Sequence, residues 1–229
     1  MPLAVLPALL QDVGPVSDTF LAAFKDEPIM RFLYPRGVDR DLHVEATAEQ
    51  WNQDRIVYNY KCVDIDTAKI VGMASWEIYW LPGDENGWKK PQDIPWLEGE
   101  EKERCLRILG PMWDVREQLF GNRHHIYLHA LAVHPDHQRR GVGSLLVQQG
   151  IQIAEQFGLP IYTESSQPAI HLYKSLGFEQ LTHVRLIHKA EVLGEDKDSE
   201  VPLVVKMPSK AKGLSFREWS ERGYDKNYA

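Results

Sequence analysis

The hydrophobic and polar positions of this chain follow two spacings, which together predict a domain that mixes helices and strands. Apolar residues recur at helical spacing after Asp12, at Val16, Phe20 and Phe24, and the aspartate is suited to cap a helix. Short apolar or alternating runs bounded by turn residues are typical of strands. The elements predicted in this way are a strand over 2–6, helices from Asp12 and over 39–53, a strand pair over 56–63 and 70–80, a helix after Gly143, a strand over 160–164, a helix over 166–176, and strands near 178–187 and 201–207.

Prolines, glycines and tryptophans interrupt this pattern between Pro82 and Asn122. They predict an insertion over about 81–122 that holds short helices, the clearest over about 100–119 with a break near Gly110-Pro111. The insertion is either the wall of a substrate pocket or a flap over one face of the sheet. From Pro208 the sequence is polar, which predicts a partly disordered tail over 208–229 after a single domain over 1–207.

Charge and cysteine content narrow the class of protein. Twenty-six basic against 33 acidic residues leave a net charge of −7, so we expect neither a nucleic-acid nor a membrane partner. Cys62 and Cys105 are too few for a disulfide framework and favour a reducing compartment. The apolar N-terminus lacks a preceding basic residue and is interrupted by Pro2 and Pro7, which argues against a signal peptide. We therefore expect a cytoplasmic protein.

The segment from Leu128 to Ser144 carries the clearest chemistry. An apolar strand breaks at Pro135 into Gln138-Arg139-Arg140-Gly141-Val142-Gly143-Ser144 and then opens an amphipathic helix. Free backbone amides, a positive helix end and two arginines converge there, which predicts a pyrophosphate site on the amides of about 139–144. A Walker loop would need a lysine where Ser144 stands, and a dinucleotide fingerprint a third glycine where Leu146 stands.

A second motif, Leu172-Tyr173-Lys174-Ser175-Leu176-Gly177-Phe178, follows about 30 residues later. In this order the two motifs resemble the signature of the GNAT superfamily of N-acetyltransferases, most closely over roughly 124–180. The resemblance implies a mixed, mostly antiparallel central sheet flanked by helices, with acetyl-CoA as cosubstrate. The cofactor contacts that it implies are Gln138, Arg139, Arg140, Gly141, Val142, Gly143 and Ser144 at the pyrophosphate, the backbone of Leu131, Ala132 and Val133 along the pantetheine arm, and Ser166, where the family commonly has an asparagine.

The resemblance also implies catalytic roles. Tyr173 occupies the position that the superfamily uses to protonate the departing thiolate, although a phenol of pKa about 10 is a weaker acid than a thiol of about 8.5. The attacking amine must lose a proton, and His129 is the candidate base. By strand alternation it shares a face with Tyr127 and Leu131. The strand resembles that of arylalkylamine N-acetyltransferases, which have two histidines; Tyr127 replaces the first here, so His129 acts alone or through water.

Several alternatives stay open at this stage. Glu77 and Glu164 lie on predicted strands and are the fallback bases, and no histidine shows the spacing of a metal site, so no metal is expected. An acidic chain with tryptophans in its insertion favours a small, cationic or aromatic amine as acceptor. The other acceptor class is a protein or peptide amine. A non-catalytic acyl-CoA-binding sensor would need the loop but neither His129 nor Tyr173.

Overall fold

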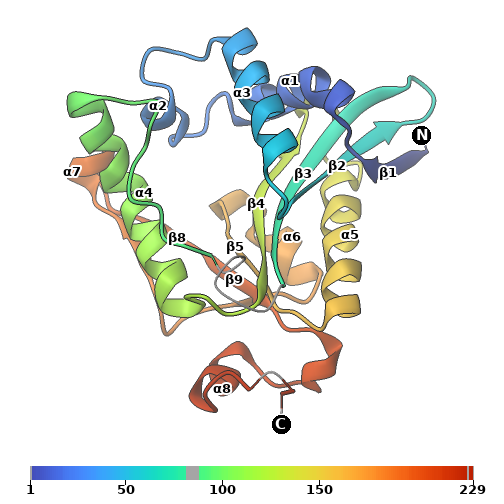
Figure 1. Ribbon diagram of the computed structural model, residues 1–229, viewed down its shortest axis with the longest axis vertical. Helices are drawn as coiled ribbons and strands as arrows, with labels where there is room; N and C mark the ends of the chain where they lie inside the picture. The colour runs from blue at the N-terminus through green and yellow to red at the C-terminus, as the bar shows by residue number, and fades with distance from the viewer. Residues whose placement is uncertain (1, 81–87, 226, 229) are drawn as a thin grey trace.

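Most of the predicted strands assemble into one sheet in the computed structural model, which describes residues 2–80, 88–225, 227 and 228 (Figure 1). The strand predicted near 178–187 is instead divided between this sheet and a separate hairpin. Within the described residues the sheet has seven strands in the order β1-β2-β3-β4-β5-β9-β6, antiparallel except for the pair β4 and β5. This confirms the mixed, mostly antiparallel sheet. The strands of this sheet are β1 (Leu3–Pro7), β2 (Val57–Asp64), β3 (Lys69–Tyr79), β4 (His125–Val133), β5 (Ile161–Glu164), β6 (Glu179–Gln180) and β9 (Leu203–Lys206), and a separate hairpin is formed by β7 (Leu186–His188) and β8 (Ser199–Val201).

Helices cover both faces of the sheet, with α4 and α5 on opposite sides of its central strands (Figure 1). The predicted helix over 39–53 is confirmed as α3, and the Asp39 side chain caps it by accepting from two backbone amides. One face of the sheet packs against α5 and α6, and the other packs against α1. The helices are α1 (Val13–Phe24), α2 (Met30–Leu33), α3 (Arg40–Gln53), α4 (Gly99–Leu119), α5 (Val142–Phe157), α6 (Ile170–Ser175), α7 (Ala190–Leu193) and α8 (Phe216–Glu221).

The approach of α5 to the sheet depends on Gly150. The glycine faces the fully buried ring of Trp76 on β3, and a Cβ at this position would lie 2.2 Å from the Trp76 ring. Real Cβ atoms do not approach so closely, so the helix or the ring would have to move. The absence of a side chain here lets α5 sit directly on the sheet, and this seating fixes the position of the loop that precedes the helix.

We predict that Gly150→Ala destabilises the protein by about 1–3 kcal/mol because it overpacks this contact. Gly110→Ala is the matched control, since Gly110 is also helical and a Cβ there would meet nothing within 4 Å. That variant should gain roughly 0.5–1 kcal/mol from helix propensity. Thermal unfolding of the two variants checks this, and equal melting temperatures would contradict the packing argument.

The insertion differs from its prediction in one respect. Its main helix, α4, runs without a break through Gly110 and Pro111. A proline inside a helix removes one backbone donor and crowds the carbonyl four residues earlier, but α4 is held on both sides of Pro111 by buried residues such as Ile108 and Val115. The first part of the insertion, with Pro82, Gly83 and Gly87, lies outside the described residues.

The C-terminal segment is also more ordered than its polar composition suggests. It was expected to be a partly disordered tail from Pro208, yet it forms α8 and packs against the sheet. Phe216 is fully buried 5.3 Å from the Phe120 ring, and the Tyr228 hydroxyl donates to the Gly158 carbonyl at 2.7 Å. A few regularly spaced aromatic side chains supply enough apolar surface to hold an otherwise polar segment.

The structure also describes the two cysteines and the apolar character of the helices. Cys62 and Cys105 are separate, buried thiols. Among the described helices, none combines the length and apolar character required to cross a lipid bilayer.

Candidate active site

Strands β4 and β5 run side by side only at their beginnings and then separate. They pair at Ile126 with Ile161 and at Tyr127 with Tyr162, and beyond this the Thr163 hydroxyl donates to the Leu128 carbonyl at 2.9 Å. Among the described residues, the rest of β4 has a strand partner only on its β3 side. The gap leaves backbone groups available to an extended ligand. The contacts expected at Leu131, Ala132 and Val133 lie along this stretch and stay predictions.

A β-bulge at His129 reorients β4 beside the gap. Ser75 of β3 pairs with Ala130 and Trp76 pairs with Leu128, so His129 is an extra residue in its strand. The bulge interrupts the alternation of side chains. His129 and Tyr127 line one face, as expected, but Leu131 turns to the opposite face and packs in the core with α5. The prediction that Leu131 shares a face with His129 was wrong. It assumed a regular strand, whereas the extra residue of the bulge shifts the alternation of all side chains that follow it in β4.

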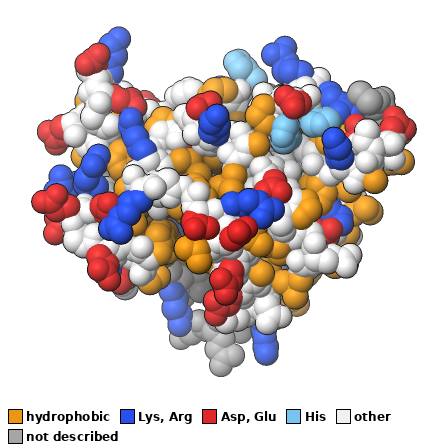
Figure 2. Space-filling model, turned by 90° about the horizontal axis from the view of Figure 1, so that it is seen from above, with side chains coloured by type: hydrophobic (Ala, Val, Ile, Leu, Met, Phe, Trp, Pro, Cys, Tyr) orange, Lys and Arg blue, Asp and Glu red, His pale blue; other side chains and the backbone are white. Residues whose placement is uncertain are grey.

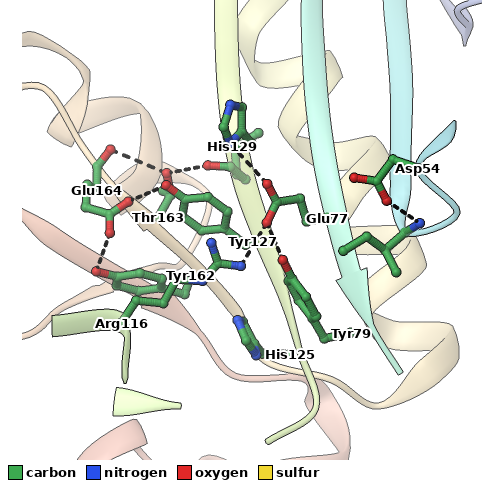
Figure 3. Close-up of polar contacts among 12 residues, drawn as sticks. Asp54, Glu77, Tyr79, Arg116, His125, Tyr127, His129, Tyr162, Thr163 and Glu164 are labelled. Carbon is green, nitrogen blue, oxygen red and sulfur yellow. Dashed lines mark hydrogen bonds and ion pairs between the residues drawn. The ribbon is translucent and has the colours of Figure 1, made fainter. Parts of the chain in front are cut away.

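His129 and Glu77 form a pair that the sequence did not predict. The Glu77 Oε1 lies 3.1 Å from His129 Nδ1, and the His129 side chain is 54% exposed while that of Glu77 is 15% exposed (Figure 3). Desolvation would lower the pKa of His129, but the hydrogen bond and charge of Glu77 outweigh it and hold this pKa above the ordinary 6.5. Two residues that were alternative candidates for the base thus act on one another.

Arg116 of α4 completes this cluster from the insertion. Its guanidinium donates to Glu77 Oε2 at 2.9 Å and stacks on the rings of Tyr127 at 3.8 Å and Trp88 at 4.8 Å from the ring centroids. The Tyr79 hydroxyl donates to the same carboxylate oxygen at 2.5 Å. Burial would raise the pKa of Glu77, yet these partners and His129 hold it well below its ordinary range. Sequence reasoning missed Arg116, whose only signal is a charge on the inward side of a helix.

Glu164, the other fallback base, lies across the gap on β5. Its two carboxylate oxygens accept from the hydroxyls of Tyr127 at 2.8 Å and Tyr162 at 2.7 Å (Figure 3). Tyr127, which stands in place of a second histidine, therefore links β4 to β5 through its hydroxyl group and does not serve as a base.

The predicted pyrophosphate loop has the required backbone shape. Gly141 has φ +84° and precedes α5, and its carbonyl accepts a helical hydrogen bond from the Leu145 amide at 3.0 Å. The amides of 142–144 therefore have no acceptor within the helix. A Cβ on Gly143 would lie 3.3 Å from Leu172 Cδ2, so the two sequence motifs meet in space. This geometry fits a bound diphosphate.

The charged side chains of the loop take different roles. The Arg140 guanidinium donates to the buried Asp64 carboxylate at 2.7 Å and contacts His137 Nδ1 at 2.5 Å, so it anchors the loop to the end of β2. Gln138 and Arg139 are exposed, and Arg139 has φ +61°. The cofactor contacts expected at Gln138, Arg139 and Arg140 stay predictions, and the ion pair with Asp64 engages the Arg140 side chain.

Tyr173 and Ser166 lie apart from His129. Tyr173 is buried on α6, in the core on the α5 side of the sheet, with its ring 5.3 Å from that of Phe178. Burial raises the pKa of Tyr173 further above 10, which makes it a weaker acid. Ser166 is exposed just after β5. Among the described residues, no hydrogen bond or ring contact joins Tyr173 to His129.

A cavity of about 1450 Å³ opens beside Glu77 and His129. Helices α1, α3 and α4 and the segment 88–98 form its walls, so the described part of the insertion lines a pocket and does not merely cover the sheet. Figure 2, which views the molecule from above, shows hydrophobic side chains reaching the surface between charged ones. His129 lines this cavity and belongs to the stretch of β4 that borders the gap.

The site thus combines a glycine loop at the start of α5, a gap beside β4 and a histidine supported by a carboxylate at a pocket. The profile of the acetyltransferase (GNAT) family matches residues 26–178, and the chain belongs to this family. It is 34% identical over 144 residues to the "Probable acyltransferase SID5" of Ajellomyces capsulatus, across 63% of this chain and 98% of that protein.

Solved structures share the fold. A Corynebacterium glutamicum structure described as histone acetyltransferase HPA2 and related acetyltransferase has a TM-score of 0.58 at 22% identity, over 91% of this chain and 97% of that one. The mosquito arylalkylamine N-acetyltransferase like 5b has a TM-score of 0.58 at 18% identity, over 90% of this chain and 100% of that one. Their similarity supports the arrangement of strands and helices and leaves the acceptor undetermined.

Proposed function

We propose that this protein transfers an acetyl group from acetyl-CoA to the primary amine of a small molecule. The observation that carries the proposal is the Glu77–His129 pair, which lines the cavity beside the gap. Acetyl-CoA would supply the reactive thioester. The amides of 139–144 would hold its pyrophosphate, and the free edge of β4 at 131–133 would hold its pantetheine arm.

His129 would take the proton of the attacking amine. A lysine-like amine of pKa about 10.4 is neutral only about once in 10³ at pH 7, which withholds roughly 4–5 kcal/mol unless a base accepts the proton. Glu77 faces Nδ1, so it favours the tautomer with hydrogen on Nδ1 and a lone pair on Nε2. It also stabilises the imidazolium that forms. A backbone amide of β4 would stabilise the oxyanion that develops on the thioester.

Tyr173 would donate its hydroxyl hydrogen to the departing sulfur. Because burial raises the pKa of Tyr173, we assign this residue a hydrogen bond to the thiolate and not a complete transfer of the proton. A hydrogen bond to a charged group contributes about 1.5–3 kcal/mol, so Tyr173→Phe should lower kcat by about 10–100-fold with little change in acetyl-CoA affinity. Tyr58→Phe, on the exposed side of β2, is the control. If the protein is a non-catalytic sensor, calorimetry will detect binding but no variant will have turnover to lose.

The dependence of rate on pH tests the base. His129 must be neutral to accept a proton, so kcat/KM should rise with pH through the pKa of His129, which lies above 6.5. Glu77→Gln removes the charge that raises this pKa, and the midpoint of the acidic limb should move to lower pH. A limb that stays in place in this variant would assign the titration to another group.

The cavity beside His129, which is walled by helices α1, α3 and α4, favours a small molecule over a protein surface as acceptor. The test is thiol release from acetyl-CoA in the presence of arylalkylamines, alkylamines, polyamines, aminoglycosides and peptides. We expect release with small amines. Release with peptides alone would replace the small molecule by a protein or peptide acceptor, and no release with any amine would refute the proposal.

A further inference from the structure

The cavity is larger than a small amine needs. Pockets that enclose drug-sized ligands usually measure roughly 300–1,000 Å³, whereas this one measures about 1450 Å³. Residues of β4 form the floor of the cavity, and the excess space extends away from this floor between α1, α3 and α4. An amine of one ring would leave most of it to water.

The wall of this space is predominantly hydrophobic. Aromatic and aliphatic side chains from three helices face it, and none of them belongs to the cluster around Glu77: Phe20, Phe24, Trp51, Leu109, Met112 and Trp113. Most of them are only partly buried by the rest of the protein. A ligand with an apolar body would remove this surface from water, which is favourable in proportion to the area covered.

The floor of the cavity is polar and has an excess of negative charge. Arg116 neutralises Glu77, but Glu164 accepts hydrogen bonds only from two tyrosine hydroxyls and has no cationic partner among the described residues. With His129 neutral, one carboxylate charge is therefore uncompensated beside the base. An ammonium group supplies the opposite charge at the position where it must lose a proton.

Two carboxylates higher in the cavity, those of Glu101 and Asp93, are already matched by ion pairs. Glu101 pairs with Arg36 at 2.8 Å, and Asp93 pairs with Lys102 at 3.0 Å. These pairs are partly exposed and need no charge from a ligand. We therefore place recognition of a cation at the floor, where Glu164 lies beside the base, and recognition of apolar surface at the walls.

Building on the proposed function, we infer that the acceptor is an amphipathic primary amine. Its amine end lies at the floor formed by Glu77, His129 and Glu164, and an extended apolar body fills the space between α1, α3 and α4. This narrows the substrate class from small amines in general to amines with a long or multi-ring hydrophobic part.

The test is a series of unbranched amines, n-propylamine, n-pentylamine and n-octylamine, with acetyl-CoA and thiol release as the readout. Burial of a methylene contributes about threefold to fourfold in affinity, so kcat/KM should rise by about a hundredfold or more from the shortest to the longest amine. A kcat/KM for n-octylamine equal to or below that for n-propylamine would overturn the inference while leaving the proposed N-acetyltransfer intact.

Two variants on α3 locate the effect. Ala46 lines the cavity and is otherwise exposed, so Ala46→Trp should fill the apolar space without disturbing a core. We expect it to lower kcat/KM for n-octylamine by about tenfold or more, as loss of two or more buried methylenes would, and to leave n-propylamine unchanged. Asn52→Trp adds the same side chain on the same helix outside the cavity and should match the unaltered protein. An equal loss for both amines in Ala46→Trp would contradict the assignment of the apolar space.

A failure of the proposed function would give a different result. If no amine causes thiol release, calorimetry with the protein saturated with coenzyme A measures amine binding directly. Tighter binding of n-octylamine than of n-propylamine would then support an amphipathic ligand without acetyl transfer. Equal or undetectable binding of the two amines would overturn both proposals.

Discussion

Replacement of His129 by alanine should lower kcat by about 10²–10⁴, the usual contribution of a general base. The expected loss is large because His129 is the group beside both the cavity and the gap whose neutral form can accept a proton near pH 7. Glu77 is a poor substitute, since Arg116 and Tyr79 still donate to its carboxylate in this variant. Steady-state thiol release with saturating amine measures the effect, and calorimetry should show an almost unchanged affinity for acetyl-CoA.

His171→Ala is the matched control for this prediction. His171 is an exposed histidine on α6, and its loss should leave kcat unchanged. If His129→Ala retained full activity while the acidic limb of the pH profile persisted, another base would have to be assigned. Glu164 would then be the first candidate, because it faces the same cavity from β5.

Replacement of Arg116 by methionine should have the largest effect on stability. Its side chain is 7% exposed and balances the charge of Glu77, which is itself largely buried. Removal of one partner from a buried ion pair costs about 3–5 kcal/mol, because the other charge stays buried without compensation. In a chain of this length that loss corresponds to a fall of roughly 6–20 °C in Tm. Activity should fall as well, since Arg116 holds the carboxylate that orients His129.

Two further variants test this explanation. Arg107→Met removes an exposed arginine from the same helix, and its effect should lie within about 0.5 kcal/mol. The double variant Glu77→Gln with Arg116→Met removes both charges and should recover part of the stability lost by Arg116→Met alone. If Arg116→Met and Arg107→Met unfold at the same temperature, the ion pair contributes nothing to the fold.

The amino-acid sequence was sufficient to predict most of the helices and strands, and it predicted the glycine loop that precedes α5. The loop before α5 is local: its glycines, the start of the helix and the downstream Leu172-Tyr173 motif lie within one stretch of chain. Backbone shape and helix capping depend on neighbours in sequence, so they can be predicted from it. The same holds for α3, where Asp39 caps the helix at the predicted residue.

The acceptor side was decided by tertiary structure. Glu77, His129 and Arg116 come from β3, β4 and α4, and only the packing of the insertion against the sheet brings the arginine to the carboxylate. The bulge at His129 follows from the register between β3 and β4, which no local pattern shows. Likewise α4 passes through Pro111 and α8 folds onto the sheet because distant apolar residues hold them. Local propensities predict elements, but contacts between residues far apart in sequence fix side-chain direction, charge pairing and the shape of the cavity.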